Sequence, residues 1–278
     1  MSKEIVLITG TNSGFGYLST LKLASQGYTV IATMRNLSKQ TALRSEVKQK
    51  KLTDRIEILP LDVTNQEHIE QVQQYVERQY GKIDILINNA GYSTGGITEL
   101  LDLEEWKAQF ETNLFGVIAV TKAFLPMMRE RRQGKIINIG SISGHVGFPG
   151  LGPYVSSKFA LSGFSESLRL ELLPFNIHVS IVEPGSYKTD IWEKALSKIN
   201  LTTESEYDEF LQKIYAEAKR SGEQAACPDE VIEVITNICR SKNPKFRYPV
   251  GKGIRSVIFM KNILPWSWFE AIVRRKMK

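Results

Sequence analysis

A tyrosine and a lysine four residues apart form the pair in this sequence with the clearest potential for chemistry. Tyr154 and Lys158 lie in "PYVSSK" (153–158), after the glycine-rich stretch "GHVGFPGLG". On a helix, positions i and i+4 share a face, so the phenol and the ammonium would be neighbours. A nearby cation favours the phenolate and lowers the pKa of a phenol, which ordinarily lies near ~10. The alternative is a surface pair at a helix start, and the pair alone does not decide.

The elements around this pair indicate an α/β protein. Pro153 is a natural first helical residue, and apolar residues follow it at helical spacing, so we expect a helix at about 154–173. Strands separated by helical patterns and buried on both faces indicate a parallel sheet with right-handed crossovers. The predicted fold is a single doubly wound Rossmann-type parallel sheet with helices on both faces. Its strands are predicted at 4–9, 28–33, 55–61, 82–91, 135–141 and 178–185.

The chain offers no linker that would divide it, so we predict one domain over residues 1–278. Residues from about 186 to 226 break the alternation with two amphipathic helical patterns and no strand. We interpret this insertion as a helical substrate lid over the carboxyl edge of the sheet. A basic, aromatic extension occupies about 251–278.

The loop "TGTNSGFG" (9–16) joins the first predicted strand to the first predicted helix. Its glycines, Gly10, Gly14 and Gly16, permit a tight turn, a close approach of the backbone to a pyrophosphate, and close helix packing. The helix N-terminus supplies free N–H groups and a partial positive charge. A plain glycine-rich turn is the alternative, but the place of the loop favours dinucleotide binding.

Five short motifs together resemble the short-chain dehydrogenase/reductase family. They are the glycine loop, "NNAG" (88–91), Ser141, the Tyr154–Lys158 pair, and "EPG" (183–185) with Thr189. They occur in the family's order over about residues 3–250, and two stretches look closest to its retinol and hydroxysteroid dehydrogenases. The resemblance implies hydride transfer between a nicotinamide cofactor and a carbonyl or alcohol.

The resemblance also implies four catalytic residues. Tyr154 would be the general acid/base, and Lys158 would lower its pKa and hydrogen-bond the nicotinamide ribose. Ser141 would hydrogen-bond the substrate oxygen, and Asn113, in "ETNLFG", would hold a water in the proton relay. Taken alone, Ser141 could be a turn residue at a strand end and Asn113 a satisfied polar group on a helix.

Cofactor contacts follow from the same resemblance. Asp62 would bind the adenine amino group and Asn89 would face the adenosine ribose, although Asn89 could instead tie two strands together. The segment after the sixth strand would hold the carboxamide and the pyrophosphate. The full predicted set is Gly10, Asn12, Ser13, Gly14, Phe15, Gly16, Arg35, Asp62, Val63, Asn89, Ala90, Gly91, Tyr154, Lys158, Pro184, Gly185 and Thr189.

The end of the second predicted strand bears on the choice of cofactor. An acidic residue there binds the ribose 2′-hydroxyl of NAD, whereas an arginine accommodates the 2′-phosphate of NADP. Met34 stands where the acid would be, Arg35 follows it, and no carboxylate lies between Gly27 and Ser45. We therefore predict a preference for NADP(H) over NAD(H). A solvated surface arginine is the alternative, and Ser13 stands where many NADP-preferring relatives carry a second basic residue.

Apolar side chains flank the predicted site. Val146 and Phe148 follow Ser141, and the lid carries Trp192. We take these four residues as substrate contacts, and the apolar ones suggest a bulky lipophilic alcohol or ketone. Alternatively, the apolar side chains only pack the lid against the body. His145, in the same loop, is expected to be solvated.

Composition argues against several other classes of protein. The net charge of +6 is mild, lies largely at the end of the chain and forms no basic stripe, so no nucleic-acid partner is expected. Cys227 and Cys239 lie twelve residues apart with no CxxC motif and no nearby histidine. Neither a disulfide framework nor a zinc or other metal site is therefore predicted. With no leader-like segment and no run of 18 uncharged apolar residues in the sequence, we expect a cytoplasmic protein.

Two surfaces suggest partners besides a small-molecule substrate. The C-terminal segment could lie weakly on an anionic membrane surface or fold back over a neighbouring pocket, but core packing or a partner contact is the more ordinary expectation. The family resemblance also implies a homo-oligomer, for which we expect a homodimer paired through the long helices at about 103–131 and 154–173; a tetramer stays open. Apolar residues available there are Phe110, Leu114, Phe159 and Leu168.

These features predict an NADP(H)-dependent oxidoreductase that interconverts a carbonyl and a primary or secondary alcohol. The substrate, the physiological direction and the pathway stay open. The alternative is a catalytically silent NADP(H)-sensing regulator on the same fold. A sensor would have no need of the full set Asn113, Ser141, Tyr154 and Lys158.

Overall fold

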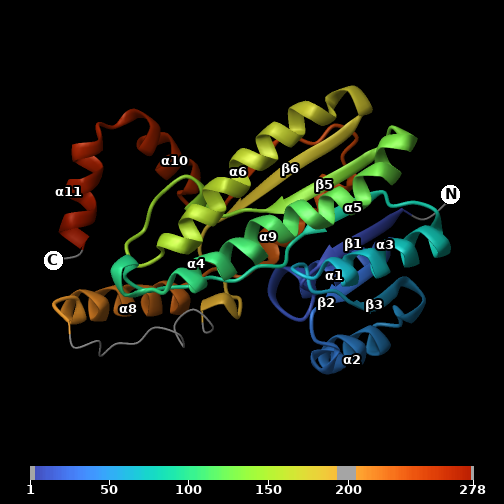
Figure 1. Ribbon diagram of the computed structural model, residues 1–278, viewed down its shortest axis with the longest axis horizontal. Coiled ribbons are helices and arrows are strands. Elements are labelled where there is room, and N and C mark those ends of the chain that lie inside the picture. Colours follow the sequence, from blue (N-terminus) through green and yellow to red (C-terminus); the bar gives the residue numbers. More distant parts are fainter. Residues whose placement is uncertain (1–3, 193–204, 277–278) are drawn as a thin grey trace.

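The computed structural model describes residues 4–192 and 205–276 and is built on one seven-stranded sheet (Figure 1). All strand pairs are parallel, in the order β3–β2–β1–β4–β5–β6–β7. The order reverses between β1 and β4, which is where an open α/β sheet binds its ligand. The predicted doubly wound α/β fold is confirmed. The strands are β1 Ile5–Thr9, β2 Thr29–Met34, β3 Ile56–Pro60, β4 Ile85–Asn88, β5 Gly134–Ile139, β6 Ile177–Pro184 and β7 Arg247–Val250.

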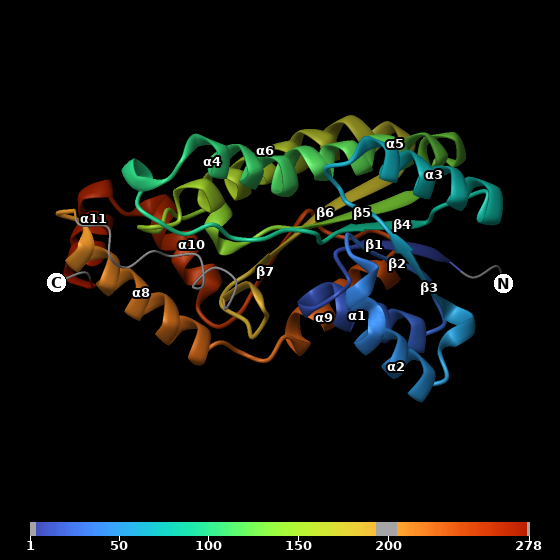
Figure 2. The same ribbon diagram turned by 60° about the horizontal axis from the view of Figure 1, so that its bottom comes forward.

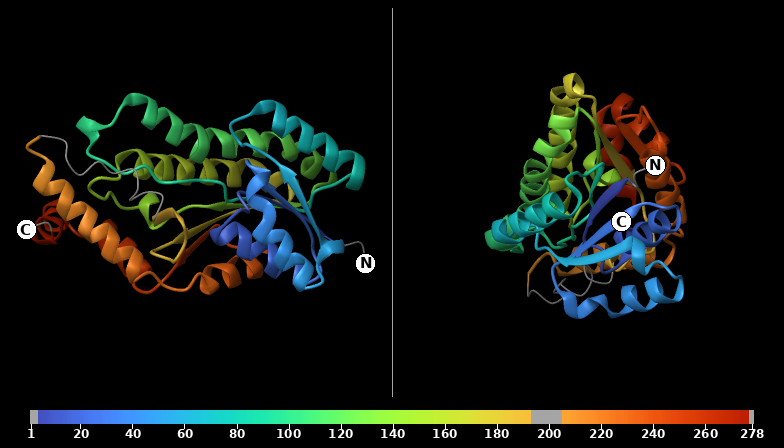
Figure 3. Two further views of the ribbon diagram at one scale, coloured as in Figure 1. Left: turned by 90° about the horizontal axis from the view of Figure 1, so that it is seen from below. Right: turned by 90° about the vertical axis from the view of Figure 1, so that its right-hand side faces the viewer.

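Helices cover both faces of the sheet. Helices α3, α5 and α6 lie on one face and α1, α2 and α9 on the other, as Figures 2 and 3 show. Helix α4 continues the first layer beyond the carboxyl ends of the strands (Figure 2). The bounds are α1 Gly14–Ser25, α2 Thr41–Gln49, α3 Gln66–Tyr80, α4 Leu103–Phe110, α5 Gly116–Arg131, α6 Gly152–Leu172, α8 Asp208–Glu223, α9 Asp229–Arg240, α10 Ile254–Ile263 and α11 Trp266–Lys276.

Two hydrophobic cores hold these layers together. Successive residues of β1 point to opposite faces, so Ile5 and Leu7 join one core while Val6 and Ile8 join the other. All of β1 is consequently buried, which is why its sequence is continuously apolar rather than alternating. The sheet holds the carboxyl ends of β1, β4, β5 and β6 side by side.

Of the two long helices predicted near the site, one agrees with the structure and the other is interrupted. Helix α6 begins at Gly152 with Pro153 in its first turn, within two residues of the prediction. The long helix expected at 103–131 is instead two α-helices joined by a π-helical turn, Glu111–Phe115. A π-turn adds a residue to the helical turn and re-aims the side chains within it.

The seventh strand was not predicted from the sequence. Strand β7 has only four residues, one of them Pro249, and it pairs only with β6 at the edge of the sheet. Three of its four residues are only partly buried, because one side of an edge strand faces away from the sheet. The apolar run that reveals a central strand is therefore missing.

The lid and the C-terminal segment are both helical. In the lid, α8 corresponds to the second amphipathic pattern, whereas most of the first pattern lies outside the described residues, in 193–204. The C-terminal segment forms α10 and α11. Helix α10 contains no buried residue, so the expectation of core packing is wrong for this helix. Helices α8, α10 and α11 lie at the end of the molecule opposite the N-terminus (Figures 1 and 3).

Candidate active site

The glycine loop packs tightly against the end of β4. Gly10 and Gly14 have φ values of +71° and +58°, in the left-handed region that favours glycine. A Cβ on Gly16 would lie 2.4 Å from the carbonyl oxygen of Gly10 and 2.5 Å from Nδ2 of Asn89. Among the described residues, the Ser13 side chain makes no capping hydrogen bond to α1. The loop therefore brings a helix N-terminus and a bare backbone to one place, as an anionic phosphate requires.

Asn89 connects this loop to β4. Its Nδ2 atom donates hydrogen bonds to the carbonyl oxygens of Thr9 and Gly10, at 2.8 and 2.9 Å. The backbone N–H groups of Asn89 and Ala90 both donate to Oγ1 of Thr9 at 3.0 Å. The side-chain contacts of Asn89 therefore match the alternative role, in which Asn89 ties two strands together. Asn89, Ala90 and Gly91 nevertheless lie beside the glycine loop.

The end of β2 presents an exposed arginine next to the end of β3. Met34 is buried, whereas the Arg35 side chain is 79% exposed, and its Nε atom lies 3.9 Å from Oδ2 of Asp62. Asp62 also accepts hydrogen bonds from the backbone N–H and the hydroxyl of Thr64. Val63, which lies between Asp62 and Thr64 in the sequence, packs against Gly116 at the start of α5. Arg35 and Asp62 therefore face the same side of the sheet's carboxyl edge.

The segment after β6 reaches the glycine loop. A Cβ on Gly14 would lie 3.4 Å from Cγ2 of Thr189, so these two positions are in contact distance. The rings of Phe15 and Tyr187 meet edge to face with centroids 6.0 Å apart. Gly185 donates its N–H to the carbonyl oxygen of Val250 at 3.0 Å. The structure thus brings the two predicted phosphate-side segments together.

Tyr154 and Lys158 lie on one face of the first turns of α6, as the spacing predicts. Nζ of Lys158 is 5.7 Å from the centroid of the Tyr154 ring and donates a hydrogen bond of 2.8 Å to the carbonyl oxygen of Ile139. Lys158 is buried and Tyr154 is half-buried. Since Ile139 ends β5 and Ser141 follows it, the strand and the helix present all three polar side chains at one edge.

Burial dominates the proton chemistry of this pair. It raises the pKa of Tyr154 above the ordinary value, and the Ser141 hydroxyl only partly offsets that rise by hydrogen bonding to the phenol. Burial also lowers the pKa of Lys158 to about 8. The expected lowering of the Tyr154 pKa by Lys158 is not found in this geometry. The ammonium faces the ring and bonds to Ile139 rather than to the phenol oxygen.

Asn113 lies inside the π-helical turn and is buried. Its Nδ2 atom donates to the carbonyl oxygen of Tyr92 at 3.0 Å and to Oγ of Ser157 at 3.2 Å. Its Oδ1 atom accepts from the Tyr92 N–H at 3.1 Å. The amide therefore joins the loop after β4 to α6, one residue before Lys158. These contacts match the satisfied-polar alternative and also place Asn113 behind the face of α6 that carries Tyr154 and Lys158.

A buried ion-pair network under the loop after β5 was not predicted. Glu183, on β6, is 1% exposed, and its Oε1 atom lies 2.7 Å from Nε2 of His145 and 2.6 Å from NH1 of Arg247. Arg247 also donates to Oγ of Ser162 on α6 at 2.8 Å and pairs with Glu166 at 2.9 Å. The expectation that His145 is solvated is wrong, because its ring pairs with this carboxylate.

The only signal in the sequence for this network was an acidic residue inside an otherwise apolar strand, in "VEPG". A carboxylate buried at such a position needs a cationic partner. That partner, Arg247, lies on the edge strand that the sequence did not reveal. The network ties β6, β7 and α6 to the loop that carries Ser141.

The predicted substrate residues divide between packing and exposure. Val146 is buried, and Phe148 is 40% exposed. The Trp192 indole donates a hydrogen bond of 3.1 Å to the carbonyl oxygen of Tyr187 and packs against Gly222 in α8. Trp192 thus fits the packing alternative. Helix α8 packs through Leu211 and Ile214 on Ile97 in the loop after β4, and Ile214 also lies against Gly150 in the loop after β5. Tyr207 and Phe210 pack against this small core.

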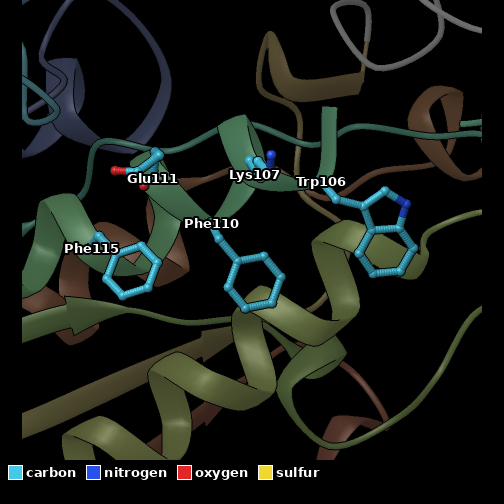
Figure 4. A pocket seen from close by; sticks show the side chains of 5 residues that line it. All are labelled: Trp106, Lys107, Phe110, Glu111 and Phe115. Atoms are coloured by element: carbon cyan, nitrogen blue, oxygen red, sulfur yellow. The ribbon is translucent and has the colours of Figure 1, made fainter. Parts of the chain in front are cut away.

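Two surface hollows are lined by residues outside the predicted site. One, of about 250 Å³, is lined by residues of α4 and the π-turn, and Figure 4 shows Phe110 and Phe115 projecting from the same side of that helix. The other, of about 340 Å³, lies between α3 and α5 and shares Phe115. Within the described residues, no group of three or more His, Cys, Asp or Glu side chains could hold a metal ion.

Comparison with known proteins assigns this chain to a family. Residues 4–200 match the family described as short chain dehydrogenase. The chain is 45% identical over 280 residues to "Uncharacterized oxidoreductase YusZ" of Bacillus subtilis, covering 100% of this chain and 99% of that protein. It is 39% identical to "3-ketodihydrosphingosine reductase" of Bacteroides thetaiotaomicron, covering 94% and 93%. It is 36% identical to human "Retinol dehydrogenase 8", covering 87% and 79%.

Solved structures agree with these relatives. A short-chain dehydrogenase from Streptomyces avermitilis superposes with a TM-score of 0.81 at 29% identity, covering 99% of this chain and 96% of that one. A serine dehydrogenase solved with NADP⁺ superposes with a TM-score of 0.75 at 29% identity, covering 88% and 94%. The relatives described here are named as oxidoreductases, reductases or dehydrogenases, and none of these names supports a silent regulator.

Proposed function

Because this chain belongs to the short-chain dehydrogenase family, in its retinol dehydrogenase-like branch, and is an oxidoreductase of CH–OH groups, we propose a specific reaction for it. It transfers hydride between NADP(H) and a lipophilic alcohol or carbonyl compound, with Tyr154 as the general acid/base. The observation that carries this proposal is the placement of Ser141, Tyr154 and Lys158 together at the carboxyl edge of β5.

The residues around the glycine loop fit a dinucleotide. Side chains at Gly10 and Gly16 would collide with backbone atoms of Ala90 and Gly10, so these positions leave bare backbone beside the α1 N-terminus. Gly10, Gly14 and Gly16 would cradle the pyrophosphate, Asp62 would face the adenine, and Thr189 would lie beside the pyrophosphate. The bound nicotinamide supplies or accepts the hydride.

In the direction of reduction, Tyr154 donates its phenolic proton to the carbonyl oxygen as that oxygen becomes negative. The raised pKa keeps the phenol protonated at neutral pH, which suits a proton donor. The Ser141 hydroxyl donates a hydrogen bond to the same oxygen. Lys158, buried one turn further on, would hydrogen-bond the nicotinamide ribose, and Asn113 holds the helix face in place through Ser157.

Arg35 supports the proposed preference for NADP(H). Its guanidinium is 79% exposed at the end of β2 and can form paired hydrogen bonds to a phosphate. Its pairing with Asp62 is long, 3.9 Å, so a 2′-phosphate competes with a weak contact. The serine dehydrogenase relative was solved with NADP⁺, which agrees with this choice.

The apolar loop and lid favour a lipophilic substrate. Val146, Phe148 and the α8 core with Ile214 lie on the segments that follow or cover Ser141. Two relatives carry names of enzymes with lipophilic substrates, 3-ketodihydrosphingosine reductase and retinol dehydrogenase 8. We therefore place a long-chain or polyene alcohol, or its carbonyl partner, first among candidate substrates.

We also propose that the protein is cytoplasmic, which cell fractionation would test.

We propose in addition that the protein forms a homodimer. Phe115, on the π-turn, is 51% exposed and lines the hollow of Figure 4, and Phe159, on α6, is 45% exposed. Leu168, considered earlier for this contact, belongs to the core of the subunit. Burying the apolar surface of α4, the π-turn and α6 against a second copy would stabilise a dimer. A monomeric mass by light scattering at micromolar concentration would reject it.

One experiment tests the reaction and the cofactor together. Purified protein is screened for NADPH and NADH oxidation with long-chain 3-keto compounds, retinoids, steroids and small keto acids, and dissociation constants are measured for both cofactors. We expect turnover with a lipophilic carbonyl, and NADPH binding that is tighter than NADH binding and weakened by Arg35→Ala. Equal affinity for the two cofactors would reject the NADP(H) preference. Turnover confined to small keto acids would reject the lipophilic substrate.

A further inference from the structure

The last two helices, α10 and α11, present an unusual surface, which we call the C-terminal helix pair (residues 254–276). Of the thirteen large hydrophobic side chains that are exposed among the described residues, six belong to it. Phe259 is 65% exposed, Trp268 64% and Ile263 62%. The other three are Met260, Trp266 and Ile272. This concentration is far above what scattered surface apolar residues produce.

Charge is concentrated in the same segment. Residues 251–278 contain seven of the 36 basic residues and one of the 30 acidic residues. Residues 1–250 therefore carry 29 of each, so the whole net charge of +6 belongs to the C-terminal segment. Within the pair, Nζ of Lys261 lies 4.5 Å from the centroid of the Trp266 ring. Basic and aromatic side chains are thus interleaved on one structural unit.

Helix α10 contacts the body of the protein along one side. Ile254 packs against Gly185, where a Cβ would lie 2.7 Å from its Cδ1 atom. Val257 and Ile258, which continue that side, are partly buried, whereas Phe259 and Ile263 are exposed. Helix α10 is therefore apolar on its inner side and also on its outer side. Within the described part of the chain, the residues Phe259 and Ile263 on the outer side stay mostly exposed.

We infer that the C-terminal helix pair docks the enzyme on the surface of an anionic lipid bilayer. A short helix with exposed Trp, Phe and Ile side chains and neighbouring basic residues lies in the headgroup region, where the apolar groups enter and the cations face anionic lipids. Tryptophan is enriched at that depth because its ring is amphipathic. Across residues 4–192 and 205–276, no helix is long and apolar enough to cross a bilayer.

A second copy of the chain fits this surface less well. Two copies meeting through it would bring together two segments of charge +6, and like charges at close range oppose association. The exposed apolar residues proposed for the dimer lie elsewhere, on the π-turn and α6. An anionic surface complements both the charge and the apolar side chains.

Docking would also bring the lid close to lipid. Helix α8 lies at the same end of the molecule as α10 and α11 (Figures 2 and 3), and α10 begins against Gly185 of the candidate active site. The inference goes beyond the proposed reaction and does not depend on which alcohol or carbonyl is used.

The test uses the full-length protein with sedimentable vesicles, without cofactor or substrate. Vesicles of phosphatidylcholine alone are compared with equal mixtures of phosphatidylcholine and phosphatidylglycerol. We expect binding at least about tenfold tighter to the anionic vesicles, and loss of binding in high salt. Two of the four tryptophans lie in the helix pair, so the emission should shift to the blue on binding.

Two double variants locate the binding surface. Arg274→Glu with Arg275→Glu, and Trp266→Ser with Trp268→Ser, should each weaken anionic-vesicle binding about tenfold or more. The matched control is Lys48→Glu with Arg78→Glu, the same change of charge on exposed residues of α2 and α3, which should bind nearly as the wild type does. Thermal unfolding confirms that each variant is folded, and Trp268→Ser alone serves if a double variant is not.

Four outcomes would overturn the inference. The first is equal binding to both vesicle types, and the second is no vesicle binding at all. The third is an equal loss of binding in the α2–α3 control. The fourth is that the variants of the C-terminal helix pair lower the mass in light scattering but keep vesicle affinity. The last would assign the surface to contact between copies. Because no cofactor or substrate is present, failure of the proposed reaction leaves this measurement unaffected.

Discussion

Two lysine–aromatic contacts in this molecule lie in opposite environments. In the candidate active site, Nζ of Lys158 lies 5.7 Å from the centroid of the Tyr154 ring. In the C-terminal helix pair, Nζ of Lys261 lies 4.5 Å from the centroid of the Trp266 ring. Lys158 is buried and its pKa is lowered to about 8, whereas Trp266 is 56% exposed.

The difference shows what burial does to a polar pair. In the interior, desolvation shifts protonation equilibria, and each polar atom must find a partner, as Lys158 does at Ile139. At the surface the same contact is weak, and its effect is to keep a cation and an aromatic ring together where another surface can meet them. The first arrangement suits proton transfer, and the second suits docking.

The largest expected effect tests the buried pair. Tyr154→Phe removes the proton donor and leaves the ring, so turnover should fall by about 10²–10⁴-fold while NADPH affinity changes little. Steady-state kinetics and cofactor titration measure the two quantities. Tyr75→Phe is the control, since it removes a phenol that is hydrogen-bonded to Glu57 on the edge strand β3, and it should keep turnover near wild type. Similar turnover in Tyr154→Phe and wild type would remove Tyr154 from the mechanism.

The second prediction contrasts two carboxylates that pair with one arginine. Glu183 is 1% exposed and Glu166 is 61% exposed, and both contact Arg247. Glu183→Gln should lower the free energy of unfolding by about 2–4 kcal/mol, because it removes one charge from a buried pair. Glu166→Gln should change it by less than about 0.5 kcal/mol. Urea unfolding measures both, and equal losses would contradict the role of burial.

Glu183→Gln also tests the positioning of the loop that carries Ser141. If the His145–Glu183 contact holds this loop, kcat should fall while the dissociation constant of NADPH stays close to the wild-type value. Activity equal to wild type in a folded Glu183→Gln protein would limit the network to stability.

The third prediction concerns the pH dependence of stability. Lys158 has a folded pKa of about 8, below its ordinary value of 10.5. Between these pH values the unfolded chain keeps the proton that the folded chain has lost, so the free energy of unfolding rises with pH. Relative to Lys158→Met, wild-type protein should gain about 1.4 kcal/mol per pH unit above pH 8.

This measurement is made by urea unfolding without cofactor from about pH 7 to 9.5, below the range where unfolded tyrosines lose their protons. Tyr154 and several other tyrosines have raised pKa values, which would lower stability above that range. Parallel curves for wild type and Lys158→Met would show that Lys158 keeps its ordinary pKa.

The smallest expected effect concerns an exposed side chain of the C-terminal helix pair. Trp268→Ser should change the free energy of unfolding by less than about 0.5 kcal/mol and leave turnover of a water-soluble substrate unchanged, because the ring is 64% exposed. Trp192→Ser should be several times more destabilising, since that indole is partly buried and hydrogen-bonded to Tyr187. Equal losses in the two variants would show that Trp268 packs on the body in solution.

Most of the fold could be predicted because its central strands are buried on both faces. Six strands were located from continuous apolar runs such as "IVLIT" in β1, and the loop at Gly10 and Gly14 was recognised from glycine spacing. Strand β7 was missed because an edge strand with Pro249 carries no such run. The π-turn around Asn113 was missed because its sequence has ordinary helical periodicity.

By itself, the sequence determined the family motifs, the order of six of the seven strands along the chain, and the shared helix face of Tyr154 and Lys158. These depend on local periodicity, glycine conformation and spacing, which act over a few residues. Only the tertiary structure decided that burial raises the Tyr154 pKa, that His145 pairs with Glu183, and that the last two helices expose their apolar side chains. Those properties depend on which distant segments surround a group, because desolvation and pairing are set by neighbours in space.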